Sequence, residues 1–130
     1  MKLLLDTHAW LWRLLDPSRI SADAEEAIAD SGSELFLSPI STWEALVLAR
    51  KGRLSLNPTP HEWVLDALRR TALAAAPLNH GIALRSETLD GFASEDPADR
   101  FLVATALELE LTLVTADQAM QDFAPVATLW

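Results

Sequence analysis

The sequence contains no cysteine and only four glycines among its 130 residues. Without cysteine the chain can form neither a disulfide framework nor a thiolate zinc site, and it has no cysteine nucleophile. A long hydrophobic run is also missing, because Asp6 interrupts the apolar start of the chain after three leucines. A signal peptide needs about 7–15 unbroken apolar residues and a membrane span about 20. We therefore expect a soluble, cytoplasmic protein that does not use a membrane.

Positive charge is scarce, with 10 Lys and Arg against 19 Asp and Glu and a net charge of −9. A net acidic surface repels nucleic acid at long range, which argues against a simple DNA-binding or RNA-binding module. It is compatible with an enzyme that gathers carboxylates around a divalent metal ion. Because half of the residues are hydrophobic and only 22% are charged, the chain should be globular. Its length predicts one domain, over residues 1–130.

Apolar runs alternate with segments of helical spacing along the whole chain. The runs predict strands at 2–5, 34–37, 73–78, 111–115 and 126–129, and 73–78 is the weakest because alanine disfavours strands. Spacing and capping residues predict helices at 7–15, 21–29, 41–51, 59–71, 81–89, 96–111 and 117–122. The third helix should open with a capping box from Ser41 to Glu44. This alternation predicts an α/β fold, a parallel sheet with helices on both faces.

Four acidic residues fall at or just beyond predicted strand ends, where parallel α/β sheets bind their ligands. Asp6 directly follows the first predicted strand and Asp117 lies just after the fourth, while Glu44 and Asp99 should lie in the first turns of predicted helices. Each acid alone is explained as a helix cap or a first-turn acid. Together they would repel, by roughly 4 kcal/mol per pair at about 4 Å and an effective dielectric of 20. A cation would relieve this repulsion, so the set indicates a metal site.

Oxygen ligands without cysteine or a metal-spaced histidine pair favour Mg²⁺ or Mn²⁺. Such ions keep several water molecules and meet phosphate groups of substrates. The chemistry that this arrangement favours is metal-assisted phosphodiester hydrolysis.

The chain resembles the PIN-domain ribonucleases, and specifically the toxins of VapBC toxin–antitoxin pairs. The resemblance rests on four stretches in the family's order: Leu3–Trp12, Ser38–Glu44, Asp96–Arg100 and Leu113–Asp117. It implies a single PIN-like domain and identifies the metal ligands and catalytic acids as Asp6, Glu44, Asp99 and Asp117. It further implies that Thr7 and Thr115 hold ligands or water, and that Asp96 contacts the metal ligands and not the metal ion.

The resemblance also implies the activity and the partners. A chain of this kind is expected to be a metal-dependent endoribonuclease that uses Mg²⁺, with Mn²⁺ as a substitute, and leaves a 5′-phosphate and a 3′-hydroxyl on RNA. It is expected to form a homodimer and to be bound by a cognate antitoxin that inserts into the active site.

Several basic and aromatic residues have two interpretations. Arg50 and Lys51 either contact RNA phosphates or offset the dipole at a helix end. Arg100 pairs with a structural partner or a site acid, or contacts phosphate. His8, His61 and His80 show no spacing of an acid–base pair. The five tryptophans favour core or interface positions over stacking on bases.

Three other classes of protein are alternatives to a nuclease. A non-catalytic PIN-like module would bind metal or an antitoxin and cut nothing, and the complete set of acids disfavours it. A phosphatase with an aspartyl nucleophile would carry a second acid two residues after Asp6, where this chain has His8. A nucleotide-binding fold is disfavoured because no glycine-rich loop follows the first strand.

Overall fold

The computed structural model describes all 130 residues and contains a five-stranded sheet in the order β3-β2-β1-β4-β5. All neighbouring strands are parallel, as the sequence predicts. The strands are β1 (Lys2–Leu5), β2 (Glu34–Leu37), β3 (Ala74–Ala75), β4 (Thr112–Val114) and β5 (Thr128–Leu129). The central strand β1 lies in register with β2 along its full length, from Lys2 opposite Glu34 to Leu5 opposite Leu37. All five strands therefore end at the same edge of the sheet.

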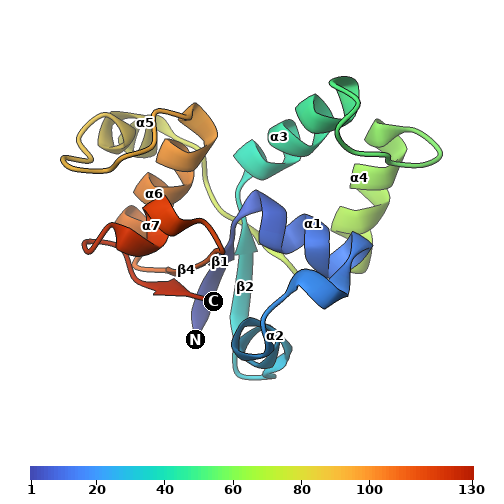
Figure 1. The fold of residues 1–130 in the computed structure, drawn as a ribbon, viewed down its shortest axis with the longest axis horizontal. Coiled ribbons are helices and arrows are strands. Elements are labelled where there is room, and N and C mark those ends of the chain that lie inside the picture. Colours follow the sequence, from blue (N-terminus) through green and yellow to red (C-terminus); the bar gives the residue numbers. More distant parts are fainter.

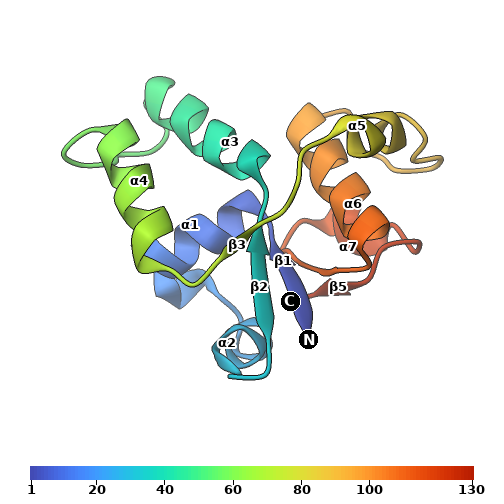
Figure 2. The same ribbon diagram turned by 180° about the vertical axis from the view of Figure 1, so that it is seen from behind.

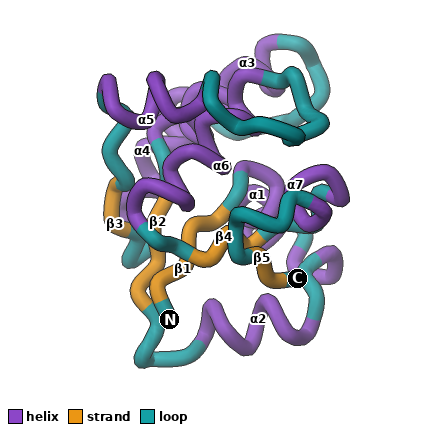
Figure 3. The backbone as a smooth tube through the Cα atoms, turned by 90° about the vertical axis from the view of Figure 1, so that its left-hand side faces the viewer, coloured by secondary structure: helices purple, strands orange, loops and turns teal.

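Helices cover both faces of the sheet. They are α1 (Thr7–Leu15), a 3₁₀ turn η1 (Pro17–Arg19), α2 (Ala22–Ala29), α3 (Pro39–Arg50), α4 (Pro60–Arg70), α5 (His80–Ser86), α6 (Pro97–Leu109) and α7 (Gln118–Asp122). Figures 1 and 2 show α1, α3 and α4 on one side of the strands and α5, α6 and α7 on the other. Figure 3 shows α2 below the sheet, at the end where β1 begins. None of these helices is long and apolar enough to cross a bilayer.

The central strand is buried on both faces, which explains why its sequence is an unbroken apolar run. Leu3 and Leu5 pack into the hydrophobic cluster that contains Trp10 of α1. Leu4, between them, points to the opposite face and packs into the cluster that contains Leu102 of α6. Successive side chains of a strand alternate between its faces, so one short segment of the sequence joins two separate cores.

Replacing Leu4 with Ala should destabilise the protein by about 2–5 kcal/mol, because it leaves a cavity in a packed core. Leu4 is fully buried. The free energy of unfolding in urea measures the effect. Leu84→Ala is the matched control, since Leu84 is 73% exposed and its loss should change stability by no more than about 0.5 kcal/mol. Equal losses in the two variants would contradict the placement of Leu4.

The prediction of a capping box at the start of α3 is wrong. The helix begins at Pro39, with Ser38 as its N-cap, whose hydroxyl accepts a hydrogen bond from the Ile40 N–H at 3.1 Å. Proline fits the first helical position because its fixed φ suits the helix and its missing N–H is not needed there. Glu44 consequently lies in the second turn of α3, and Ser41 is buried inside the helix.

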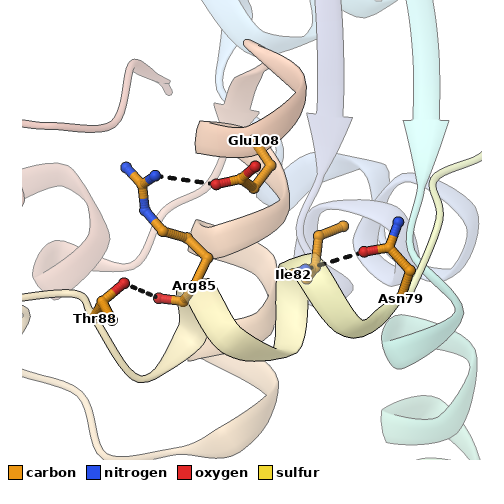
Figure 4. Close-up of polar contacts among 5 residues, drawn as sticks. All are labelled: Asn79, Ile82, Arg85, Thr88 and Glu108. Carbon is orange, nitrogen blue, oxygen red and sulfur yellow. Dashed lines mark hydrogen bonds and ion pairs between the residues drawn. The ribbon is translucent and has the colours of Figure 1, made fainter.

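Other element boundaries also differ from the prediction. The helix expected at 81–89 runs from His80 to Ser86, because Asn79 caps it by accepting from the Ile82 N–H at 3.0 Å. Figure 4 shows this cap and the ion pair at 3.0 Å between Arg85 of α5 and Glu108 of α6. The strand expected at 73–78 forms only as Ala74–Ala75, and β4 and β5 are shorter than expected. The turn η1 was not predicted, because a run of three residues carries no helical periodicity.

Candidate active site

Asp6 is a buried carboxylate at the carboxyl end of the central strand. Its Oδ1 accepts from the Ala9 N–H at 2.7 Å, so it caps α1, and its Oδ2 accepts from the Thr115 hydroxyl at 2.5 Å. Only 5% of the residue is exposed. Burial raises the pKa of Asp6 above its ordinary value, although these two hydrogen bonds and nearby His8 oppose the shift. No lysine or arginine lies within ion-pair distance of this carboxylate.

Thr115 joins the ends of β1 and β4. Its hydroxyl donates to Asp6 and accepts from the backbone N–H of Asp117 at 3.0 Å. Asp117 in turn caps α7 by accepting from the Met120 N–H at 3.0 Å. The negative charge of Asp117 contributes to the raised pKa of Asp6, so the two carboxylates lie near one another. Thr115 thereby fixes the positions of Asp6 and Asp117 relative to each other.

A second polar contact joins α1 to α3. The Thr7 hydroxyl donates to the Ser41 hydroxyl at 2.9 Å, and both residues are buried. This contact fixes the helix that carries Glu44 against the end of β1. Glu44 is half-buried and its carboxylate makes no hydrogen bond or ion pair within the chain, so it remains available to a ligand.

Asp99, in the first turn of α6, completes the group of acids. Burial, and after it the charges of Asp96, Asp117 and Glu44, raise the pKa of Asp99 to about 6, although a hydrogen bond from Ser94 at 2.8 Å opposes the shift. Asp117, the N-cap of α7, and Glu44 of α3 therefore lie near Asp99. Asp96 caps α6 by accepting from the Asp99 N–H at 3.1 Å and is exposed.

The structure therefore brings Asp6, Glu44, Asp99 and Asp117 to one edge of the sheet. No three Asp, Glu or His side chains lie close enough to hold one ion among them without rearrangement. The donors are all oxygen, they repel one another and no cation balances them. Such a set fits a hydrated ion like Mg²⁺, which binds through one or two carboxylates and keeps several water molecules. It does not form a closed protein cage.

Arg100 has a structural position. Its Nε donates to the carbonyl of Ser86 at 2.9 Å and its Nη1 donates to the carbonyl of Ser94 at 3.0 Å. The guanidinium thus ties the end of α5 to the loop that precedes α6 and pairs with no carboxylate. Arg50 and Lys51 are exposed at the far end of α3, away from the strand ends.

Sequence reasoning missed three serines at this edge: Ser38, Ser41 and Ser94. Ser38 was detectable, because a serine directly before proline is a typical N-cap. The sequence predicts Ser41 to be a helix cap, whereas in the structure its hydroxyl accepts a hydrogen bond from the Thr7 hydroxyl. Ser94 gives no local signal, since its contact with Asp99 depends on how the loop before α6 folds.

The raised pKa of Asp99 predicts a pH dependence of stability in metal-free buffer. An acid with a raised pKa stabilises the fold most below its unfolded value, 3.8, and this contribution is lost as the pH rises through about 6. The difference in melting temperature between Asp99→Asn and the parent should therefore change between pH 5 and 7, in favour of the variant at pH 7. Thermal unfolding in EDTA measures it. If the difference in melting temperature is the same at every pH, the pKa of Asp99 is not raised.

Together these features define a class of protein: a parallel α/β domain with a group of mutually repelling carboxylates beyond the ends of its strands. The PIN domain family model matches residues 3–125. The chain belongs to the PIN domain family, which confirms the fold that the resemblance implies.

Individual relatives agree with this assignment. The chain is 30% identical over 120 residues to Ribonuclease VapC22 of Mycobacterium tuberculosis, covering 92% of this chain and 90% of that protein. Its fold is similar to the crystal structure of VapBC2 from Rickettsia felis bound to a promoter DNA fragment, with a TM-score of 0.73, 14% identity and coverage of 100% and 99% of the two chains. A toxin–antitoxin complex from Klebsiella pneumoniae gives a TM-score of 0.64 at 22% identity, with 97% and 96% covered.

Proposed function

We propose that this protein is a metal-dependent endoribonuclease that acts as the toxin of a toxin–antitoxin pair and hydrolyses RNA phosphodiester bonds. The observation that carries the proposal is the buried Asp6 carboxylate, which lies near Asp117 and forms no ion pair with a lysine or arginine. A buried charge of this kind is costly unless something positive meets it. The similarity to a ribonuclease over 92% of the chain supports RNA as the substrate.

In this proposal Asp6, Glu44, Asp99 and Asp117 hold Mg²⁺, or Mn²⁺ in its place. Such an ion lowers the pKa of a bound water molecule and offsets charge on the phosphate. Thr115 fixes the direction of the Asp6 carboxylate, and Thr7 fixes α3 so that Glu44 faces the site. Asp96 holds the first turn of α6, which carries Asp99, and Arg100 holds the loop that brings Ser94 to Asp99. Arg50 and Lys51 would contact RNA phosphates farther from the cut.

The partners follow from the same proposal. We expect the protein to form a homodimer and to be inhibited in the cytoplasm by a cognate antitoxin. A toxin–antitoxin complex among the structural neighbours supports the second expectation. Trp43, which is 53% exposed on α3, and Leu68, 37% exposed on α4, are apolar residues that a second copy would cover.

Cleavage of total bacterial RNA by purified, antitoxin-free protein tests the proposed function. We expect discrete cuts with 5′-phosphate and 3′-hydroxyl ends in Mg²⁺ or Mn²⁺ and none in EDTA. Cutting that persists in EDTA would contradict the acidic mechanism. Metal binding without any cutting by folded protein would favour the non-catalytic binding module.

A further inference from the structure

A cavity of about 430 Å³ lies beside α1, lined by His8, Leu11, Trp12, Arg19, Leu48 and Arg53 among others. We call it the Trp12–Arg19 pocket. Its volume falls in the range of small-molecule sites. Its lining includes His8, which is two residues from Asp6 along the chain and lies in the first turn of α1. One end of the pocket therefore lies at the start of α1, beside the strand end that carries Asp6.

An aromatic and cationic stack forms one wall of the pocket. The guanidinium of Arg19 lies over the Trp12 ring, 4.1 Å from its centroid. His8 packs against the same ring with centroids 5.6 Å apart, and Trp130 contacts it edge-on at 5.9 Å. A planar guanidinium held on an aromatic ring presents its other face to a ligand and has lost much of its freedom before binding. This is a platform on which a flat ring can stack.

The charges of the pocket complement an anion. Arg19 and Arg53 are both exposed and neither forms an ion pair. The pocket contains one carboxylate, Asp16, whose Oδ1 accepts a hydrogen bond from the Ser18 hydroxyl at 2.7 Å. The pocket therefore carries two guanidinium groups without an ion-pair partner and one carboxylate. The position of the guanidinium groups beside an aromatic stack matches a ligand with both a flat ring and a phosphate.

We propose that the Trp12–Arg19 pocket binds one nucleotide of the RNA substrate next to the scissile phosphate. The base stacks on the Arg19–Trp12 pair, and Arg53 contacts the neighbouring phosphate. Base recognition by aromatic rings and guanidinium planes is typical of single-stranded RNA. Trp12 follows Asp6 by six residues, about 9 Å along a helix, so a nucleotide neighbouring the cut reaches the pocket. This inference rests on the proposed ribonuclease function and makes the pocket a determinant of specificity.

Binding of a short fluorescent single-stranded RNA of mixed sequence tests the pocket separately from cleavage. Anisotropy is measured in Ca²⁺, and cleavage of the same RNA is measured in Mg²⁺. We expect Arg19→Ala and Trp12→Leu each to weaken binding by about fivefold to a hundredfold, the range that stacking of one base contributes. In cleavage, KM should rise by a similar factor while kcat changes little. Arg19→Lys, which keeps the charge and loses the planar group, should recover only part of the affinity.

The matched control is Arg69→Ala. Arg69 is exposed on α4 and forms no ion pair, so its loss changes the net charge equally and removes no pocket wall. All variants are first shown to be folded by thermal unfolding. If Arg69→Ala weakens RNA binding as much as Arg19→Ala, the proposal for the pocket is wrong, and nonspecific electrostatic attraction accounts for the binding. Variants that keep the parent's RNA affinity but lose affinity for a co-purified antitoxin would also overturn it, in favour of a protein ligand.

The outcomes separate the pocket from the nuclease. RNA binding that depends on Arg19, with no cleavage in any metal, would support the pocket and contradict the proposed function. Metal-dependent cleavage with an unchanged KM in every pocket variant would support the ribonuclease function. It would contradict the proposal that the Trp12–Arg19 pocket binds RNA.

Discussion

Replacing Asp6 with Asn is expected to reduce RNA cleavage by at least about a hundredfold, because the ion's effect on the reacting phosphate contributes several kcal/mol. Asn keeps the size of the side chain and remains a good helix N-cap. The measurement is the initial rate of cleavage in saturating Mg²⁺ or Mn²⁺. Because the substitution leaves the shape of the site almost unchanged, the lost activity reports the lost charge.

Stability distinguishes this result from simple unfolding. Burial raises the pKa of Asp6, so the ionised carboxylate is unfavourable in the folded, metal-free protein at neutral pH. Asp6→Asn should therefore melt at the same temperature as the parent or higher in EDTA. Asp23→Asn, at an exposed first-turn acid of α2, is the control that should leave cleavage unchanged. A fully active Asp6→Asn variant would remove Asp6 from the mechanism.

Divalent metal is expected to stabilise the protein strongly. At a metal concentration about 100 times Kd, an ion that binds only the folded state adds about 2.7 kcal/mol. For a chain of this length that corresponds to roughly 10 °C in melting temperature. The physical reason is that the ion relieves the burial of the Asp99 carboxylate and its repulsion with Asp117 and Glu44, all of which raise the pKa of Asp99. Thermal unfolding with and without Mn²⁺ measures the shift.

Substitutions and pH make this second prediction specific. The shift should fall sharply in Asp6→Asn and Glu44→Gln. It should also be smaller at pH 5 than at pH 7, because protons compete with the ion for Asp99, whose pKa is about 6. Asp23→Asn should keep the full shift, and a salt of equal ionic strength without divalent metal should not produce it. The same shift in all variants would show that the metal binds elsewhere.

The sequence predicted the parallel sheet and the ends of β1 and β2 because their signals are local. An unbroken apolar run such as Leu3–Leu5 needs cover on both faces, and an acid directly after it ends the strand. The caps of α2 and α4, Ser21 and Thr59, were equally readable, since each side chain accepts from an N–H three residues ahead. The start of α3 was misplaced because Ser38 and Ser41 both satisfy local capping rules, and the fold uses only one.

Local patterns in the sequence are enough to place the acids at or near the ends of strands, because hydrophobic runs and helix caps act over a few residues of chain. How those acids are held depends on contacts between distant parts of the chain. The Thr115–Asp6 hydrogen bond joins residues 109 positions apart, and Thr7–Ser41 joins residues 34 apart. The role of Arg100, the contact of Ser94 with Asp99 and the Trp12–Arg19 pocket likewise depend on packing between elements. Their physical cause is proximity in space, which no pattern of neighbouring residues in the chain encodes.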